Sequence, residues 1–214
     1  MLFSLIPIAL ISFFGTPELL AQIKPVQQVV ASHTISLEKR YDNAFVNDVF
    51  KDNILLNLAY LENRVKSTEK IDWNEVEKPS HFELKLEKNE LFAFHEDVLP
   101  EYSGLKSTTS HAHFNSSEGF KSDGYLVGDG ICHFASLIYW AAKDAGLDAK
   151  APTNHDFAKI NEIPAEYGVA IYYMPGAKEA SAQQNLYIKN SKDKSITFAF
   201  DYDGENLSVS VLDK

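Results

Sequence analysis

Residues 129–146 carry the most regular helical pattern in the sequence, and this segment constrains the fold more than any other. The apolar positions that recur at helical spacing are Ile131, Ala135, Ile138, Ala142 and Ala145. We expect Asp129 to cap this helix and Gly146 to end it in a left-handed conformation. Small residues on one face predict that the helix packs closely against a sheet.

The C-terminal third of the chain predicts strands. Alternating or continuous apolar runs occupy residues 168–174, 184–190, 195–202 and 206–212, and residues 81–86 alternate in the same way. Short polar links make the three strands at residues 184–190, 195–202 and 206–212 antiparallel neighbours. The fold class predicted is α+β, in which the central helix packs on an antiparallel sheet of about four strands.

The N-terminal part of the chain predicts one helix and one targeting segment. Residues 44–61 show near-helical spacing, with Asp42 or Asn43 as the cap, whereas residues 22–41 read as a linker or an edge strand. Residues 2–14 form an uncharged apolar run, which suits a signal-peptide core better than a bilayer-spanning helix of about 20 residues.

These features divide the chain into three parts. We expect a signal peptide or membrane anchor over residues 1–21, an N-terminal extension with one helix over residues 22–80, and the main domain over residues 81–214. The apolar start also predicts that the protein is secreted or anchored outside the cytoplasm.

The charge balance excludes several classes of partner. Lys and Arg number 20 against 30 Asp and Glu, which gives a formal charge of -10, and only Arg40 and Arg64 are arginines. Nucleic acid and anionic lipid both need a basic footprint, so neither is expected as a partner. The sequence has no glycine-rich phosphate loop, and no cofactor is expected. Contact with a membrane is expected only through the N-terminal segment, if it is not cleaved.

Cys132, the single cysteine, begins the central helix and is the candidate nucleophile. Free amides and the helix dipole at such a position favour a thiolate, and the backbone at Gly128 and Gly130 is available to hold an oxyanion. His155 follows 23 residues later, as an imidazole base would.

The residue that would orient this base is Asp156, Asn154 or Asn185, and the spacing does not choose among them.

Less specific interpretations of the same residues stay open. Cys132 is either an inert buried thiol or a reactive one, and His155 is equally compatible with a solvated loop. His133 points about 100° away from Cys132 on the helix, so it is, like His113, an additional candidate rather than the expected base. His111 and His113, in the polar segment 103–123, would be zinc ligands together with Cys132 or His155, but no metal site is predicted because the sequence lacks a second cysteine.

The glycine–cysteine–helix segment, residues 124–157, resembles the core of the VanW family. Residues 92–102 resemble the upstream segment of that family, and residues 185–190 are similar to its closing strand. The likeness covers residues 92–190.

Three residues depart from the family pattern. They are Asp129 within the glycine run, His133 where the family commonly has Gln, and Asn185 where Asp is frequent. The resemblance implies a bacterial envelope protein that is associated with glycopeptide-resistance clusters and has no established activity. The helix that Cys132 opens also resembles that of transglutaminase-like and papain-like enzymes, which implies a core of that kind.

Two functions from different classes follow. One is a thiol-dependent amidase or acyl transferase that acts on cell-wall peptide or protein amides through Cys132 and His155. The other is a non-catalytic envelope module that binds peptidoglycan or a partner protein in the same glycine-lined groove. The reactivity of the thiol at neutral pH separates them.

Overall fold

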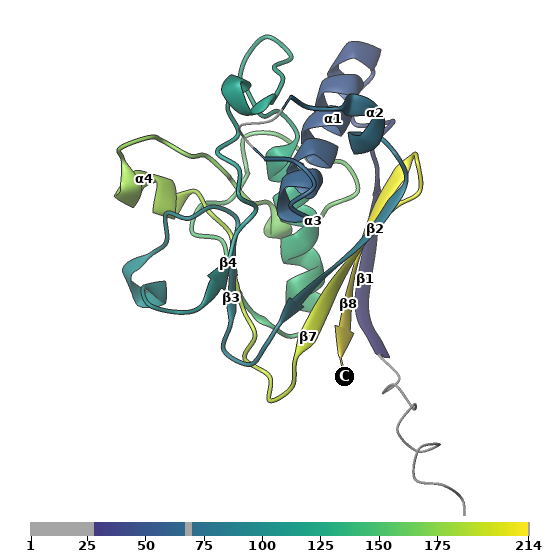
Figure 1. Ribbon diagram of the computed structural model, residues 1–214. Coiled ribbons are helices and arrows are strands. Elements are labelled where there is room, and N and C mark those ends of the chain that lie inside the picture. Colours follow the sequence, from purple (N-terminus) through teal and green to yellow (C-terminus); the bar gives the residue numbers. More distant parts are fainter. Residues whose placement is uncertain (1–27, 67–69, 214) are drawn as a thin grey trace, which may run out of the picture.

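The computed structural model describes residues 28–66 and 70–213, and four of its strands form an antiparallel sheet along one side of the molecule (Figure 1). The strands are β1 (Gln28–Ser36), β2 (Ser80–Leu86), β7 (Ile196–Tyr202) and β8 (Asn206–Asp213). Their order across the sheet is β1-β8-β7-β2, so the N-terminal strand β1 is one edge.

A second sheet of four short strands lies on the other side of the molecule. These strands are β3 (Leu91–Ala93), β4 (Ser107–Thr108), β5 (Asp148–Lys150) and β6 (Tyr187–Lys189). Their order is β4-β3-β6-β5, and the β3–β4 pair is parallel while the other pairs are antiparallel.

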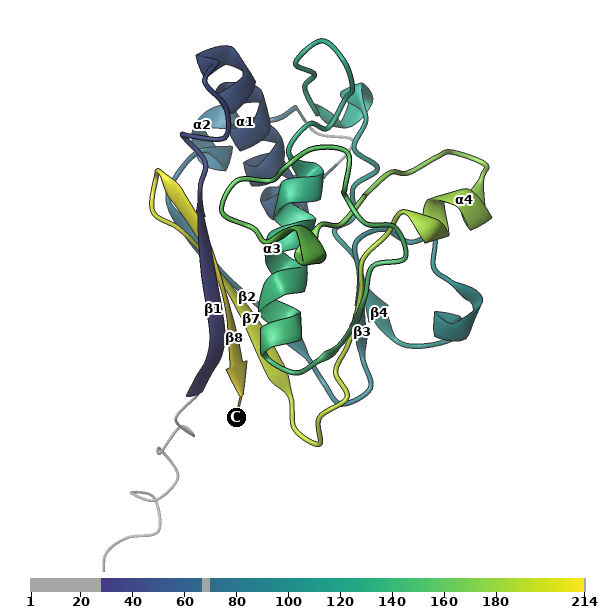
Figure 2. The same ribbon diagram turned by 180° about the vertical axis from the view of Figure 1, so that it is seen from behind.

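Helix α3 (Ile131–Asp144) lies between the two sheets (Figure 2). It contacts β1 and β8 of the first sheet and β5 of the second, and it also contacts helix α1 (Ala44–Leu61). The remaining helices are short: α2 (Trp73–Val76), α4 (Lys178–Gln183) and three 3-10 turns at Pro100–Tyr102, Ser116–Glu118 and Ala165–Tyr167.

The main core joins both sheets through α3. Phe134 on α3 contacts Phe200 of β7, with ring centroids 5.9 Å apart, and Phe94 after β3, with centroids 6.0 Å apart. All three rings are buried. Because large apolar side chains of this kind contribute about 1.5–3 kcal/mol each when buried, this stack fixes the position of α3 between the sheets.

The predicted helices are confirmed, with one correction. Asn43 caps α1 by accepting a hydrogen bond from the Phe45 N–H at 3.0 Å, and Gly146 has a left-handed φ of +69° after α3. The expected cap of α3 is wrong, because Gly130 occupies the cap position at φ +97° without a side-chain hydrogen bond. The Asp129 carboxylate turns away instead and accepts the backbone N–H of Asp123 at 3.0 Å.

The α+β class and the antiparallel sheet are confirmed, and the sheet uses three of the predicted strands as β2, β7 and β8. The strand predicted at residues 184–190 forms β6 in the second sheet, so the prediction that the last three strands are neighbours holds for β7 and β8 and is wrong for β6. The link over residues 190–195 is short, but it carries the chain from one sheet to the other.

Residues 168–174 are extended but form no strand, contrary to the sequence prediction. The Val169 N–H donates to the Ser136 hydroxyl at 2.9 Å, and the Ile171 N–H donates to the Cys132 sulfur at 3.4 Å. The Ala170 and Tyr172 N–H groups donate to the Thr153 and Gln184 carbonyls, each at 3.0 Å, so the N–H groups of this segment are divided among several partners and pair with no single strand. This segment therefore runs directly against the N-terminal half of α3.

The N-terminal prediction is tested only in part. The edge-strand reading of residues 22–41 holds over β1, whereas the signal or anchor expected over residues 1–21 lies outside the described residues. Within residues 28–66 and 70–213, the helices are all too short or too polar to span a bilayer.

Candidate functional site

A pocket of about 700 Å³ lies at the N-terminal end of α3, and we call it the main pocket. The aromatic residues that line it are Tyr41, Phe50, Tyr125, Phe157 and Tyr172. The polar and charged residues that line it are Asp42, Asn43, Asp123, Asp129, Cys132, His133 and His155. The structure therefore brings the candidate nucleophile and the candidate base into one pocket.

Cys132 is the second residue of α3, and its sulfur rests against the backbone of Ile171. The Ile171 N–H donates to the sulfur at 3.4 Å, and the Ile171 carbonyl lies 3.8 Å from it. Burial of the sulfur raises the pKa of Cys132 to about 11; the Ile171 N–H opposes this shift and the Asp129 charge adds to it. The residue as a whole is only partly buried, but its thiol is desolvated. The direction is opposite to the one that the helix terminus predicts, because desolvation outweighs the helix dipole.

His155 lines the main pocket from the loop that follows β5. Its side chain is buried, and its Nδ1 has no hydrogen-bond partner. Its ring centroid lies 4.0 Å from that of Phe157 and 6.0 Å from that of His133. Burial lowers the pKa of His155, so the imidazole is neutral at physiological pH. Among the hydrogen bonds of the described residues, none joins His155 to Cys132.

The three candidates for orienting His155 lie in different places, and Asn154 is exposed, with its Nδ2 donating to the Ala165 carbonyl at 3.3 Å. Asp156 is exposed and lines a smaller neighbouring pocket with His155, where its charge acts on the imidazole. Asn185 is fully buried and hydrogen-bonds to the segment that follows β3 instead. Its Oδ1 accepts the N–H groups of Phe94 at 2.9 Å and His95 at 3.2 Å.

The Nδ2 of Asn185 is also committed, because it donates to the His95 and Asp97 carbonyls at 3.0 and 2.9 Å. The expectation that Asn185 orients the base is therefore wrong. The residue holds β6 to the end of β3, which gives a structural reason for a polar side chain at this buried position.

His133 is more deeply enclosed than the sequence indicates. It is 3% exposed, its Nδ1 is unpartnered, and its ring centroid lies 5.0 Å from Phe50 and 6.3 Å from Tyr41. Burial lowers its pKa well below the ordinary value, and the charge of Arg40 acts in the same direction. His133 is therefore a neutral imidazole in the wall of the main pocket.

Gly128 and Gly130, whose backbone is expected from the sequence to hold an oxyanion, have different roles in the structure. The Gly128 N–H donates to the Lys121 carbonyl at 3.0 Å, so it is not free to hold an oxyanion, contrary to the prediction. Gly130 allows α1 to approach α3, because a Cβ there would lie 2.9 Å from the Phe50 carbonyl oxygen.

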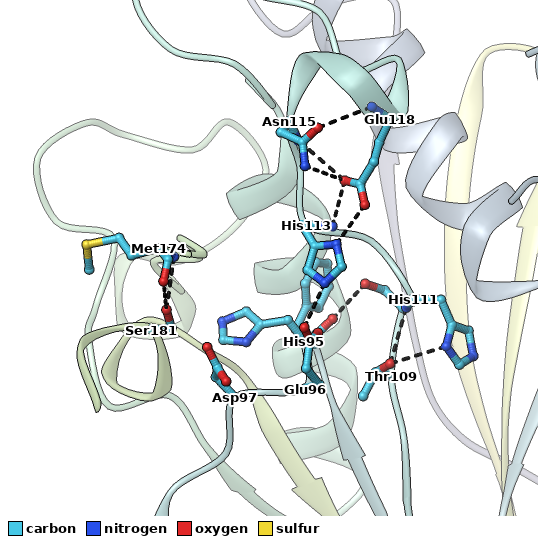
Figure 3. A network of polar contacts seen from close by, with 12 residues as sticks. His95, Glu96, Asp97, Thr109, His111, His113, Asn115, Glu118, Met174 and Ser181 are labelled. Carbon is cyan, nitrogen blue, oxygen red and sulfur yellow. Dashed lines mark hydrogen bonds and ion pairs between the residues drawn. The ribbon is translucent and has the colours of Figure 1, made fainter. Parts of the chain in front are cut away.

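A second cluster, which the sequence analysis missed, centres on His113 (Figure 3). Its Nδ1 contacts Glu118 at 2.7 Å and its Nε2 contacts Glu96 at 2.7 Å, while its ring centroid lies 4.5 Å from that of Tyr173. Burial lowers the pKa of His113, but the two carboxylates outweigh it and the net shift is upward. Glu118 is buried and also accepts the Asn115 side-chain amide at 3.1 Å. The Asn-Ser-Ser-Glu run at residues 115–118 is a capping-box pattern, which was the available signal for this cluster.

This cluster does not form the zinc site considered above. Both nitrogens of His113 contact carboxylates, and the Nδ1 of His111 lies 3.4 Å from the Thr109 hydroxyl. Over residues 28–66 and 70–213, no three His, Cys, Asp or Glu side chains are placed to hold a metal ion together.

Loop 124–128 separates the main pocket from a second one of about 380 Å³ beside His113, which we call the side pocket. Tyr125, Leu126 and Val127 line both pockets, together with Tyr172. Tyr125 is 91% exposed, and the other three are also exposed. Exposed apolar side chains gathered in this way are typical of a binding surface.

The comparison with family models agrees with the resemblance seen in the sequence. A model described as VanW like protein matches residues 85–212, more than half of the chain. Searches of curated proteins and of solved structures returned no significant match. The matched region runs from the end of β2 into β8, and it includes α3, Cys132 and both pockets except for the part contributed by residues 41–50. The chain therefore belongs to the VanW-like family.

Proposed function

We propose that this VanW-like protein binds a cell-wall peptide in the main pocket without cleaving it. One observation carries the proposal: the sulfur of Cys132 is buried against the backbone of Ile171 and shares no hydrogen bond with an imidazole among the described residues. A thiol whose pKa lies near 11 is almost wholly protonated at neutral pH, and the protonated thiol is a poor nucleophile. Cys132 is thus part of the pocket wall.

The size and lining of the main pocket support binding. About 700 Å³ lies within the range of about 300–1,000 Å³ that is usual for small-ligand sites. Aromatic rings such as Tyr125 and Phe157 offer broad faces to the backbone and side chains of a peptide, or to a sugar. Loop 124–128 presents its apolar residues on both sides, so an extended ligand would reach the side pocket as well.

The cell envelope is the proposed location. The apolar run at residues 2–14 supports export, and the likeness to the VanW family supports an envelope role. The ligand would then be a peptide of peptidoglycan or a segment of an envelope protein. The role in glycopeptide resistance that the family suggests belongs to the same proposal.

A thiol-dependent amidase or acyl transferase is the second candidate, because Cys132 and His155 line the same pocket. His155 would take the proton of the Cys132 thiol as the sulfur attacks an amide carbonyl, and would then deliver that proton to the leaving amine. Asp156 and Asn154 are the remaining candidates to orient the imidazole. This reaction needs a ligand-induced movement that releases the sulfur from Ile171.

Titration of isotope-labelled protein with a soluble peptidoglycan fragment tests the proposal. We expect amide shifts at residues of the main pocket, an intact fragment by mass spectrometry after prolonged incubation, and the same affinity in Cys132→Ala. Release of a cleaved product by the wild type and its loss in Cys132→Ala would favour the enzyme. Absence of any shift would remove the binding proposal.

A further inference from the structure

The charged side chains that line the main pocket are all acidic. They are Asp42, Asp123 and Asp129, and the described lining residues include no lysine or arginine. Two cations close to lining residues in the sequence are committed elsewhere. Arg40 is buried against Glu162, with its guanidinium 2.6 Å from the carboxylate, and Lys121 pairs with Asp52 and lies 3.9 Å from the centre of the Trp73 ring.

Two of these carboxylates, Asp123 and Asp129, lie close enough to repel each other. Asp129 accepts the Asp123 backbone N–H at 3.0 Å, and burial together with the Asp123 charge raises the pKa of Asp129. Burial also raises the pKa of Tyr41, and the charges of Asp123 and Asp129 add to that shift. Since like charges close together destabilise one another, a bound cation would relieve this part of the pocket.

His133 supplies an independent sign that the pocket holds a polar ligand. Its side chain is nine-tenths or more buried in the pocket wall, and its Nδ1 has no partner. Buried polar atoms in proteins are almost always hydrogen-bonded, so an orphaned nitrogen needs an explanation. A neutral imidazole offers one acceptor and one donor, which suits a ligand that carries N–H groups.

From the acidic lining, the orphaned imidazole and the aromatic rings around them, we infer that the ligand of the main pocket is a peptide with a free primary amine. This inference rests on the proposed binding function and adds the class of ligand. The ammonium group would bind near Asp123 and Asp129, against the faces of Tyr41 and Tyr125. Carboxylates and aromatic faces together are the combination that stabilises an organic ammonium ion.

The test compares two probes by isothermal titration calorimetry on the full chain. One is a soluble cell-wall peptide with a free lysine ε-amine, and the other is its Nε-acetylated copy. We expect acetylation to weaken binding at least tenfold, and Asp129→Asn to weaken only the free-amine peptide. Glu179→Gln, which removes the same charge from the exposed surface of α4, should leave both affinities unchanged.

A second variant protects the test against local misfolding. Asp129 holds the turn at Asp123, whereas Asp42 is exposed at the rim, so Asp42→Asn should also weaken the free-amine peptide selectively while the protein stays folded. Equal binding of the two peptides would overturn the amine inference and leave the binding function standing. Binding of neither peptide would overturn both.

Discussion

The backbone N–H of Ile171 donates a hydrogen bond to the sulfur of Cys132 at 3.4 Å. This contact joins the segment 168–174 to the first turn of α3 and gives the lone cysteine a structural partner. It also marks where the sulfur is buried, and this burial, which outweighs the opposing effect of the Ile171 N–H, keeps the thiol protonated.

Replacing Ser136 tests the attachment of the same segment one turn further along α3. Its hydroxyl accepts the Val169 N–H at 2.9 Å and donates to the Cys132 carbonyl at 2.6 Å, and the side chain is fully buried. Ser136→Ala would leave a buried N–H unpaired, so we expect a loss of about 1–3 kcal/mol in the free energy of unfolding, measured in urea. Ser191→Ala, at an exposed site, is the control. An unchanged Ser136→Ala midpoint would show that water or a rearrangement satisfies Val169.

Two glycines at the ends of α3 make a matched comparison. Gly146→Ala meets open space and costs only the left-handed strain at φ +69°, about 1–2 kcal/mol. Gly130→Ala carries similar strain at φ +97° and also places a Cβ 2.9 Å from the Phe50 carbonyl oxygen. We expect a clearly larger fall in thermal stability for Gly130→Ala. Equal losses of thermal stability in the two variants would mean that α1 moves away from the added Cβ without destabilising the fold.

Replacing Asn185 should lower the free energy of unfolding and leave the reactivity of the Cys132 thiol unchanged. Asn185→Leu removes acceptors from the Phe94 and His95 N–H groups and leaves them buried. We expect destabilisation of several kcal/mol by urea titration. The alkylation rate of Cys132 in the folded variant should equal that of the wild type. A selective change in thiol reactivity at unchanged stability would restore Asn185 as a positioning residue for the site.

The His113 cluster predicts a pH dependence of stability. Because the folded-state pKa of His113 is raised by Glu96 and Glu118, its contribution is complete below the unfolded value of about 6.5 and is lost as pH rises through the folded value. The other groups that face it are Tyr173 and His95, and burial lowers the pKa of His95, which keeps it neutral.

The measurement is the difference in unfolding free energy between wild type and His113→Gln from pH 5.5 to 9. The difference cancels the contribution of His81, whose pKa is also raised, chiefly by its hydrogen bond to Asp201. We expect the stability advantage of the wild type to shrink as pH rises. A constant difference would show that the two carboxylates do not depend on a protonated imidazole.

The sequence predicts the parts of the fold that depend on local periodicity. Helices α1 and α3 and the hairpin β7–β8 follow from apolar spacing and short turns. Residues 168–174 have the same strand-like pattern, yet two of their N–H groups bond to Ser136 and Cys132 on α3. No local pattern encodes those partners, because they come from a helix more than 30 residues earlier. For the same reason, the assignment of β6 to a second sheet could not be read from its short link to β7.

The candidate site shows a similar division. That Cys132 opens a helix follows from the sequence, and the structure places His155 in the same pocket. The burial of the sulfur depends on the position of Ile171, and burial reverses the expected direction of the pKa shift. Likewise, Asn185 looks like a site residue until its contacts with Phe94 and His95 are known.

Alkylation kinetics of Cys132 test the central claim most directly. The rate of reaction with iodoacetamide is measured against pH in the folded wild type, in His155→Ala and in His133→Ala. We predict slow alkylation at neutral pH, a midpoint far above the ordinary thiol value of about 8.5 and toward 11, and no response to either histidine. A midpoint below about 7.5 that rises in His155→Ala would contradict the account and identify Cys132 and His155 as a catalytic pair.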